Sequence, residues 1–360
     1  MKRMRQFKRK GFVEIQFNWI FILVIGGIIL TFFITIADKQ KTVSEVKVSA
    51  KVRSDLKTIF TGARASTGTA SLVDIADKDI TYSCEGFSVN DLNPVHEGIS
   101  FAPGSLQGFK IMVWSKDWSM PFRVGNILMV TSPNVKYLIV GDSSLSRELN
   151  RSLPPKFIAR GSSRQLLLNK ETVADANTIM NEGNYRIRLI FVNRNPLGTE
   201  GLLDINTLED TDVSALSIMG NSLDGPGELR FYQKRGQYWS TVPGSSNYLG
   251  RESLFAAVMA DDYKSYNCNM QNLFQRMETV SEVYTQKAGK LQQAAQAAGD
   301  TACATQYALS LDALQSIKQH ATSLATSFPE QAALIQLHQK AQELRSRNEQ
   351  AQRLSCSEVY

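Results

Sequence analysis

The strongest pattern near the start of the chain is an uncharged stretch from Ile15 to Ala37 that follows a very basic segment. Six of the first ten residues are Lys or Arg. At about 1.5 Å per residue, a helix over this stretch is about 35 Å long, enough to cross a hydrocarbon layer about 30 Å thick. The pattern predicts a transmembrane helix over residues 15–37, preceded by a basic tail over residues 1–14.

A secretory signal peptide also has a basic head, but its apolar core is usually about 7–15 residues long. The longer run favours a retained signal anchor, although the small residues in Thr35-Ile36-Ala37 leave cleavage as an alternative. The basic tail predicts that the N-terminus lies in the cytoplasm and the body outside. Lys and Arg residues between 39 and 53 weaken this prediction of orientation. We expect a single-pass cell-membrane protein whose first partner is the lipid bilayer.

The segment over residues 38–60 is charged, yet it carries apolar residues at every fourth position. Val48, Val52, Leu56 and Phe60 form one stripe along a helix. This spacing indicates a helical stalk that ends near Thr61-Gly62, and a disordered linker fits the charged composition equally well.

The body over residues 70–250 has short apolar runs bounded by Gly, Pro, Asn and Ser, which is typical of strands. Helical patterns over 144–152 and 171–181 alternate with strands between Tyr137 and Val192, an order that favours parallel pairing with right-handed crossovers. A hairpin follows, in which residues 228–233 pair with residues 237–242. The predicted strands are residues 109–114, 127–130, 136–140 and 185–192.

Beyond residue 250 the chain becomes rich in Ala, Gln, Leu and Lys, with apolar residues at steps of three and four. Gly299-Asp300 ends one helix and caps the next, and Ser327-Phe328-Pro329-Glu330 has the form of a capping box. We predict helices over 253–298, 300–326 and 328–356. The fold class is therefore mixed α+β: a transmembrane helix and stalk, an α/β head with a partly parallel sheet, and an antiparallel three-helix bundle over 253–356.

This helical arrangement restricts the pairing of the four cysteines. Cys303 and Cys356 lie at nearly the same height in antiparallel neighbours, within reach of a bond. Cys268 lies about 40 Å along the bundle from Cys303, so its partner would be Cys84 in the head. Two disulfides suit an oxidising exterior, and four buried free thiols in a reducing compartment are the alternative.

Charge argues against a nucleic-acid partner. Residues 1–53 hold eleven Lys and Arg against three acidic residues, whereas residues 54–360 hold 29 against 31. A protein that docks on phosphates carries its basic surplus on the folded domain. We expect no DNA or RNA binding.

Gly141-Asp142-Ser143-Ser144-Leu145 resembles the Gly-Asp-Ser-Leu block of a family of esterases and lipases, which implies Ser143 as the nucleophile. A serine needs a base, which that family supplies as a histidine preceded by an aspartate three residues earlier. The histidines here are His96, His320 and His338, and Ile317 and Ile335 precede the last two at that spacing. A helix cap at Asp142 or Ser143 accounts for the same residues.

The sequence contains no phosphate-binding or metal-binding motif of ordinary spacing. Asp204, Asp210 and Asp212 lie in a polar loop, where such a run is typically solvated. We predict no catalytic residue, no cofactor and no metal site.

Lys8-Arg9-Lys10-Gly11-Phe12 ahead of an apolar helix resembles the leader of type IV prepilins, which implies cleavage after the glycine. Those of bacteria have Glu at the fifth mature position, where this chain has Gln16. The segment from Gln16 to Gly27 also resembles uncharacterised single-pass archaeal membrane proteins, which implies a location and no activity.

Three functions follow. We expect a membrane-anchored extracytoplasmic protein with a binding or assembly role. Its partner is an unidentified protein or, in a homo-oligomer, a second copy of the chain. The alternatives are a pilin-like subunit of a surface filament or secretion assembly, and a serine hydrolase that uses Ser143.

Overall fold

The computed structural model describes residues 11–90, 92–96, 98–160, 163–173, 185–196, 209, 212–236 and 238–360. They form two compact units, residues 1–52 and 53–360, which are treated separately below. The basic tail before Gly11 lies outside the described residues.

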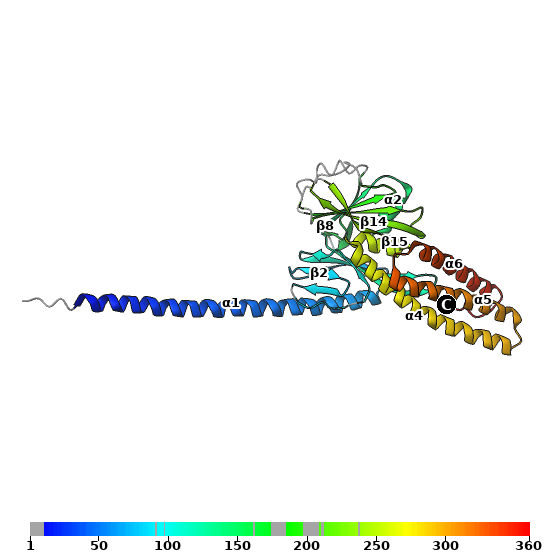
Figure 1. Ribbon diagram of the computed structural model, residues 1–360, viewed down its shortest axis with the longest axis horizontal. Helices are drawn as coiled ribbons and strands as arrows, with labels where there is room; N and C mark the ends of the chain where they lie inside the picture. Colours follow the sequence, from blue (N-terminus) through cyan, green and yellow to red (C-terminus); the bar gives the residue numbers. More distant parts are fainter. Residues whose placement is uncertain are drawn as a thin grey trace, which may run out of the picture. The chain divides into compact units, whose positions relative to one another are not determined.

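The first unit consists of most of α1 (Gly11–Ala65), the longest helix (Figure 1). Among the described residues, it is the one helix long and apolar enough to cross a membrane. Its large apolar side chains from Trp19 to Ile36 are exposed, as a lipid-facing helix requires. The mixed α+β fold with a long apolar N-terminal helix agrees with the sequence prediction. The predicted end of the stalk helix near Thr61-Gly62 is wrong, because α1 continues to Ala65.

The last turns of α1 belong to the second unit. Leu56 and Phe60 are fully buried, and the ring of Phe60 lies 5.1 Å from that of Phe87 and 6.5 Å from that of Tyr82. The C-terminal part of the apolar stripe, at Leu56 and Phe60, therefore packs against the head.

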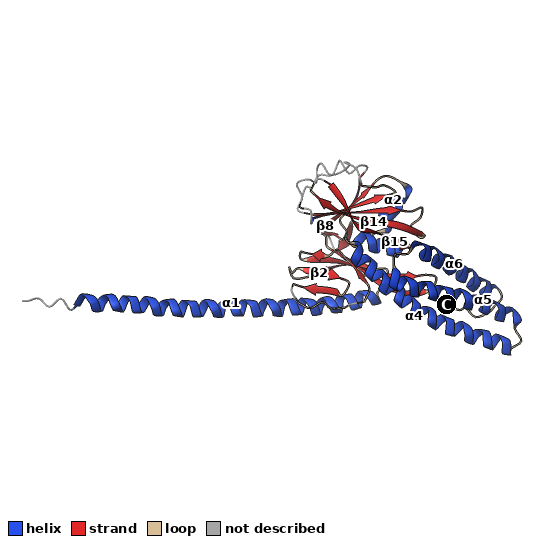
Figure 2. Ribbon diagram, viewed as in Figure 1, coloured by secondary structure: helices blue, strands red, loops and turns tan. Residues whose placement is uncertain are grey.

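Small antiparallel sheets follow (Figure 2). One has the order β1-β6-β7-β4 and the other β3-β2-β5, with only β4 and β7 parallel. The strands are β1 (Ala70–Asp74), β2 (Ile80–Ser83), β3 (Gly86–Val89), β4 (Ser100–Phe101), β5 (Ser105–Leu106), β6 (Lys110–Ser119) and β7 (Arg123–Thr131).

A six-stranded sheet has the order β11-β8-β12-β13-β14-β15, with β11, β8, β12 and β13 parallel. The predicted hairpin is present as β14 and β15. The prediction of a helix over 171–181 is wrong at its start, because residues 171–173 pair with β8 as part of β11; residues 174–181 lie outside the described part. The elements are β8 (Val135–Val140), α2 (Ser144–Ser152), the hairpin β9 (Phe157–Arg160) and β10 (Ser163–Leu166), β11 (Lys170–Val173), β12 (Arg186–Val192), β13 (Val213–Met219), β14 (Pro226–Arg235) and β15 (Tyr238–Leu249).

Four helices complete the chain: α3 (Arg251–Met259), α4 (Tyr263–Ala297), α5 (Thr301–Ser327) and α6 (Gln331–Arg353). The single helix predicted over 253–298 is therefore broken, because Asp262 caps α4 by accepting from Ser265 N. The predicted capping box does not form either: α6 begins after Glu330, whose side chain makes no cap hydrogen bond.

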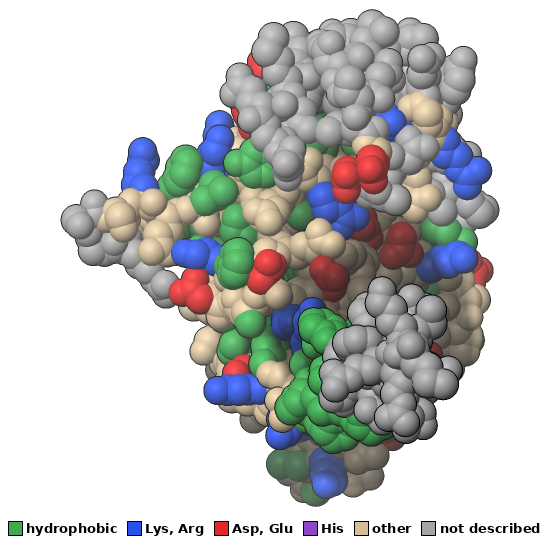
Figure 3. Space-filling model, turned by 90° about the vertical axis from the view of Figure 1, so that its left-hand side faces the viewer, with side chains coloured by type: hydrophobic (Ala, Val, Ile, Leu, Met, Phe, Trp, Pro, Cys, Tyr) green, Lys and Arg blue, Asp and Glu red, His purple; other side chains and the backbone are tan. Residues whose placement is uncertain are grey.

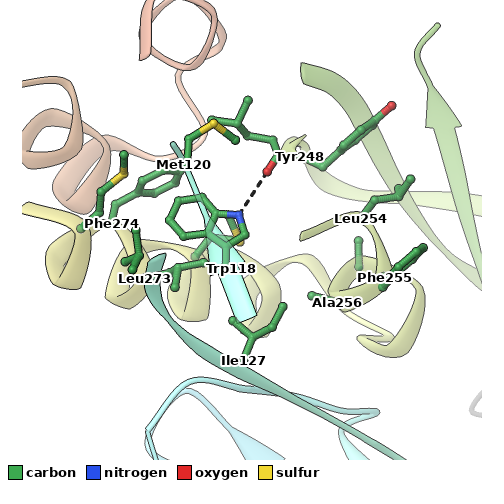
Figure 4. Packing of buried hydrophobic residues seen from close by; sticks show 14 of the residues in the cluster. Trp118, Met120, Ile127, Tyr248, Leu254, Phe255, Ala256, Leu273 and Phe274 are labelled. Atoms are coloured by element: carbon green, nitrogen blue, oxygen red, sulfur yellow. Dashed lines mark hydrogen bonds between the residues drawn. The ribbon is translucent and has the colours of Figure 1, made fainter. Parts of the chain in front are cut away.

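One continuous core joins the sheets to the C-terminal helices (Figure 4). Trp118 of β6 is completely buried, packs 5.7 Å from the ring of Phe274 in α4 and donates from Nε1 to Leu249 O. Phe255 of α3 lies 5.2 Å from the ring of Trp114. Because α3 and α4 fill this core, residues 70–250 and the helical region fold as one unit.

Candidate functional site

A cleft of about 690 Å³ opens at the amino ends of the parallel strands. This volume is in the range of small-molecule sites. Figure 3 looks onto this edge of the sheet and shows a hollow with acidic side chains (red) inside and basic ones (blue) beside it. The described lining residues are Pro103, Gly104, Ser105, Val135, Tyr137, Arg186, Ile187, Arg188, Asp212, Val213, Ser214, Gln233, Lys234, Arg235, Gly236, Met259, Asp261 and Asp262.

The strand register explains how β12 supplies two arginines to this cleft. Arg188 pairs with Tyr137 on one side and with Ser214 on the other, and Ser214 pairs with Gln233. Residues that pair across a sheet point to the same face, and so do residues two apart in one strand. Arg186 therefore lies on the same face as Arg188, one row nearer the edge.

Arg186 connects three elements around the cleft. It donates to the carbonyl of Ser105, 2.5 Å away, and lies 3.8 Å from a carboxylate oxygen of Asp212 and 3.9 Å from one of Asp261. Asp261 also accepts a hydrogen bond of 2.9 Å from the amide of Gly104. These contacts hold the β4–β5 turn and the α3–α4 connection against the sheet.

Arg188 lies deeper, and only 2% of it is exposed. Its guanidinium donates to the carbonyls of Ala257, Ala260 and Asp261 at the end of α3, where a cation is favourable, and lies over the ring of Phe231. The residue thus caps α3 from the middle of a parallel strand.

Burial dominates the electrostatics of this site. It lowers the pKa of Arg188 to about 10, against the opposing effect of Asp261, and it raises the pKa of Asp261 and of Tyr137. Arg188 stays charged at neutral pH. Charges so poorly hydrated interact more strongly with one another and with any ligand than surface charges do.

Sequence reasoning did not identify this cleft. The side chain of Asp212 is 41% exposed and lies 3.8 Å from Arg186, while Asp204 and Asp210 lie outside the described residues. A signal was present in β12, where Arg186 and Arg188 interrupt an otherwise apolar strand on one face. Two charges on the buried face of a central strand require partners nearby.

Ser143, the nucleophile implied by the esterase resemblance, lies at the opposite edge of the sheet. It caps α2 by accepting a hydrogen bond of 3.0 Å from Ser146 N, and its hydroxyl is 2.6 Å from that of Ser146. The histidines belong to the segment after β3 (His96), to α5 (His320) and to α6 (His338). The cap accounts for the contacts of Ser143.

The cysteines lie in two pairs at disulfide distance. The Cα atoms of Cys84 and Cys268 are 5.8 Å apart, and those of Cys303 and Cys356 are 5.7 Å apart. These are the pairs that the helix heights indicated. The first pair joins the segment between β2 and β3 to α4, and the second joins α5 to the residues after α6.

Comparison of the chain with protein-family models, with curated proteins and with solved structures finds no match in any of the three. The site therefore stands on its own geometry. Among the described residues, no group of three or more His, Cys, Asp or Glu residues is placed to hold a metal ion.

Proposed function

We propose that this protein is anchored in the cell membrane by α1 and carries an exported head with a binding or assembly role rather than a catalytic one. The observation that carries the proposal is the uncharged stretch of α1, whose exposed apolar side chains need a lipid surround. The N-terminus lies in the cytoplasm and residues 53–360 lie outside, where Cys84–Cys268 and Cys303–Cys356 are disulfide-bonded.

The polar contacts in the cleft support a binding role. Arg186 and Asp261 hold neighbouring elements together through paired contacts, and Arg188 caps α3. Such a network gives a preformed, rigid surface, which reduces the entropy cost of binding.

The C-terminal helices offer a second surface. We take α4, α5 and α6 as an antiparallel three-helix bundle: α5 contacts both of the others, and Lys318 of α5 pairs with Glu282 of α4 at 2.8 Å. Their outward faces present Val283 and Ile335 to a protein partner or to a second copy of the chain.

Anchoring is tested by placing charge in α1. A variant with Ile25→Arg and Leu30→Arg lowers the favourable free energy of insertion by roughly 5 kcal/mol or more, since each Arg at the centre of a span costs about 2.5 kcal/mol or more. Val43→Arg with Val46→Arg is the matched control, because it adds the same charge to exposed positions beyond the uncharged stretch.

After alkaline extraction of host membranes, we expect the wild type and the control to stay in the pellet and the first variant to be released. Release of the wild-type chain without detergent would overturn the proposal.

A pilin-like subunit is the second candidate. The leader-like Lys8–Phe12 is followed by a helix that continues from its apolar part into the packed face formed by Leu56 and Phe60. N-terminal sequencing of the mature protein tests it: a start at Phe12 supports this candidate, and an intact N-terminus through Gly11 removes it.

A further inference from the structure

The floor of the cleft contains a buried hydrogen-bond donor that lacks an acceptor. The two Nη atoms of Arg188 donate to the end of α3, but its Nε has no partner among the described residues. A buried N–H without an acceptor costs about 1–3 kcal/mol, so natural structures keep few of them. An acceptor supplied by a ligand in the cleft would remove this cost.

A second donor lies at the mouth of the same cleft. Arg235, at the end of β14, is exposed and has no hydrogen-bond or ion-pair partner within the part of the chain that the structure describes. In β14, Gln233 pairs with Ser214. Arg235 follows Gln233 by two residues, so the register places Arg235 near the row of Arg186. The cleft therefore has one cationic donor inside and another at its entrance.

The charges around these donors restrict what an acceptor can be. The charged side chains that line the cleft are three carboxylates and four cations: Asp212, Asp261, Asp262, Arg186, Arg188, Lys234 and Arg235. With four cations against three carboxylates, the lining has a net charge of +1 and suits a ligand with one negative charge better than a doubly charged phosphate. A carboxylate has one charge and a planar pair of oxygens that match guanidinium N–H groups.

We propose that the cleft binds a small molecule or a peptide terminus through a carboxylate, which accepts from Arg188 Nε on the inside and meets Arg235 at the mouth. The inference rests on the proposed binding role of the head and names its ligand chemistry. It is independent of the anchor, since the cleft is built entirely within residues 53–360.

Calorimetric titration of the full chain in detergent micelles tests the proposal with three peptides: Ala-Ala-Ala with a free carboxyl group, its C-terminal amide, and its N-acetylated form. We expect the free-carboxyl peptides to bind and the amide to bind about ten- to a hundredfold more weakly, as loss of a charge-assisted hydrogen bond implies. Equal binding of acid and amide, or no heat from the acid up to about 10 mM, would overturn it.

Variants locate the site. Arg188→Lys keeps the positive charge but removes Nε, and Arg235→Gln removes the donor at the mouth without touching the core. We expect each to weaken binding of Ala-Ala-Ala about tenfold or more. Arg147→Gln is the matched control, because Arg147 is half exposed and pairs with Asp142 at the other edge of the sheet. Should Arg188→Lys fail to fold, Arg235→Gln alone decides, and unchanged binding by a folded variant refutes the assignment.

Smaller probes separate the two sources of a carboxylate. Acetate and glycine that bind as tightly as the tripeptide identify a small-molecule site, and much weaker binding identifies a peptide terminus. Phosphate that binds more tightly than any carboxylate contradicts the charge argument. Failure of all these probes leaves the anchored assembly role intact, because alkaline extraction tests that role separately.

Discussion

Replacing Cys303 and Cys356 by alanine, singly and together, tests whether this pair is bonded. The two cysteines are 53 positions apart in the sequence, and both side chains are buried, with 7% and 9% exposed. In the chain-entropy model, closing a loop of this length stabilises the folded state by about 4 kcal/mol at 25 °C. Losing one sulfur atom from a buried position costs about 1 kcal/mol more through packing.

If the bond is present, either single substitution removes all of it, so each costs about 5 kcal/mol and the double variant only about 6 kcal/mol. If the residues are free thiols, the single variants cost about 1 kcal/mol each and the double variant about 2 kcal/mol. The two outcomes differ in additivity, and the difference does not depend on the exact packing cost.

The assay is urea unfolding of the full chain in detergent without reductant, followed by tryptophan fluorescence. Trp118 is a suitable probe because it is buried against Phe274 in α4, within the same core. The coupling free energy of the two substitutions is the unfolding cost of the double variant minus the summed costs of the two single variants. A value near zero would refute the bond, whereas about −4 kcal/mol is expected.

Three further predictions concern the head. Phe60→Ala costs about 3–5 kcal/mol in unfolding free energy, because Phe60 is fully buried against Tyr82 and Phe87. Ser54→Ala is the control at an exposed position of the same helix, and it costs less than about 0.5 kcal/mol. Equal costs for the two variants would contradict the packing of α1. Burial lowers the pKa of Lys170 from its ordinary value of 10.5 to about 8, because it disfavours the charged form. The unfolded state then binds more protons between these values, so the stability of the wild type relative to Lys170→Met rises as the pH increases from about 8 to about 10.5; a flat difference in denaturation midpoints would contradict this. Ser143→Ala costs about 1 kcal/mol through loss of the cap on α2 and leaves labelling by a fluorophosphonate probe at background, whereas labelling of the wild type that the variant loses would restore the hydrolase hypothesis.

Local patterns predicted the elements whose signal lies in consecutive residues. The uncharged run before Ala37, the strand at residues 136–140 and the hairpin around Arg235 all depend on neighbours along the chain, and each is present. Helix periodicity also put Cys303 and Cys356 at the same height, because the rise per residue converts sequence distance into length.

The errors arose where tertiary contacts decide the local structure. Residues 171–173 have a helical pattern, yet they join β8 as an edge strand of the parallel sheet. The break at residues 260–262 follows from Arg188 and Asp262, which cap the ends of α3 and α4. Asp262 is a local signal, but Arg188 lies in β12, more than 70 residues away in the chain from Ala260.

The cleft could not be predicted for the same reason. Its residues come from six separate parts of the chain, between Pro103 and Asp262, and only the sheet register brings them together. Arg186 and Arg188 are visible in the sequence as charges in an apolar strand. Their partners at Ser105 and Ala257 are backbone carbonyls, which leave no trace in the side-chain pattern.

Protease accessibility tests the central claim, that α1 stays in the membrane and the head is exported. The chain, tagged at its N-terminus, is produced in a bacterial host, and protease is added to intact spheroplasts and to lysed ones. We predict that protease removes the head from intact spheroplasts and leaves a protected fragment that contains the tag and the segment up to about Ala37. A full-length chain that stays protected until the spheroplasts are lysed would contradict the account.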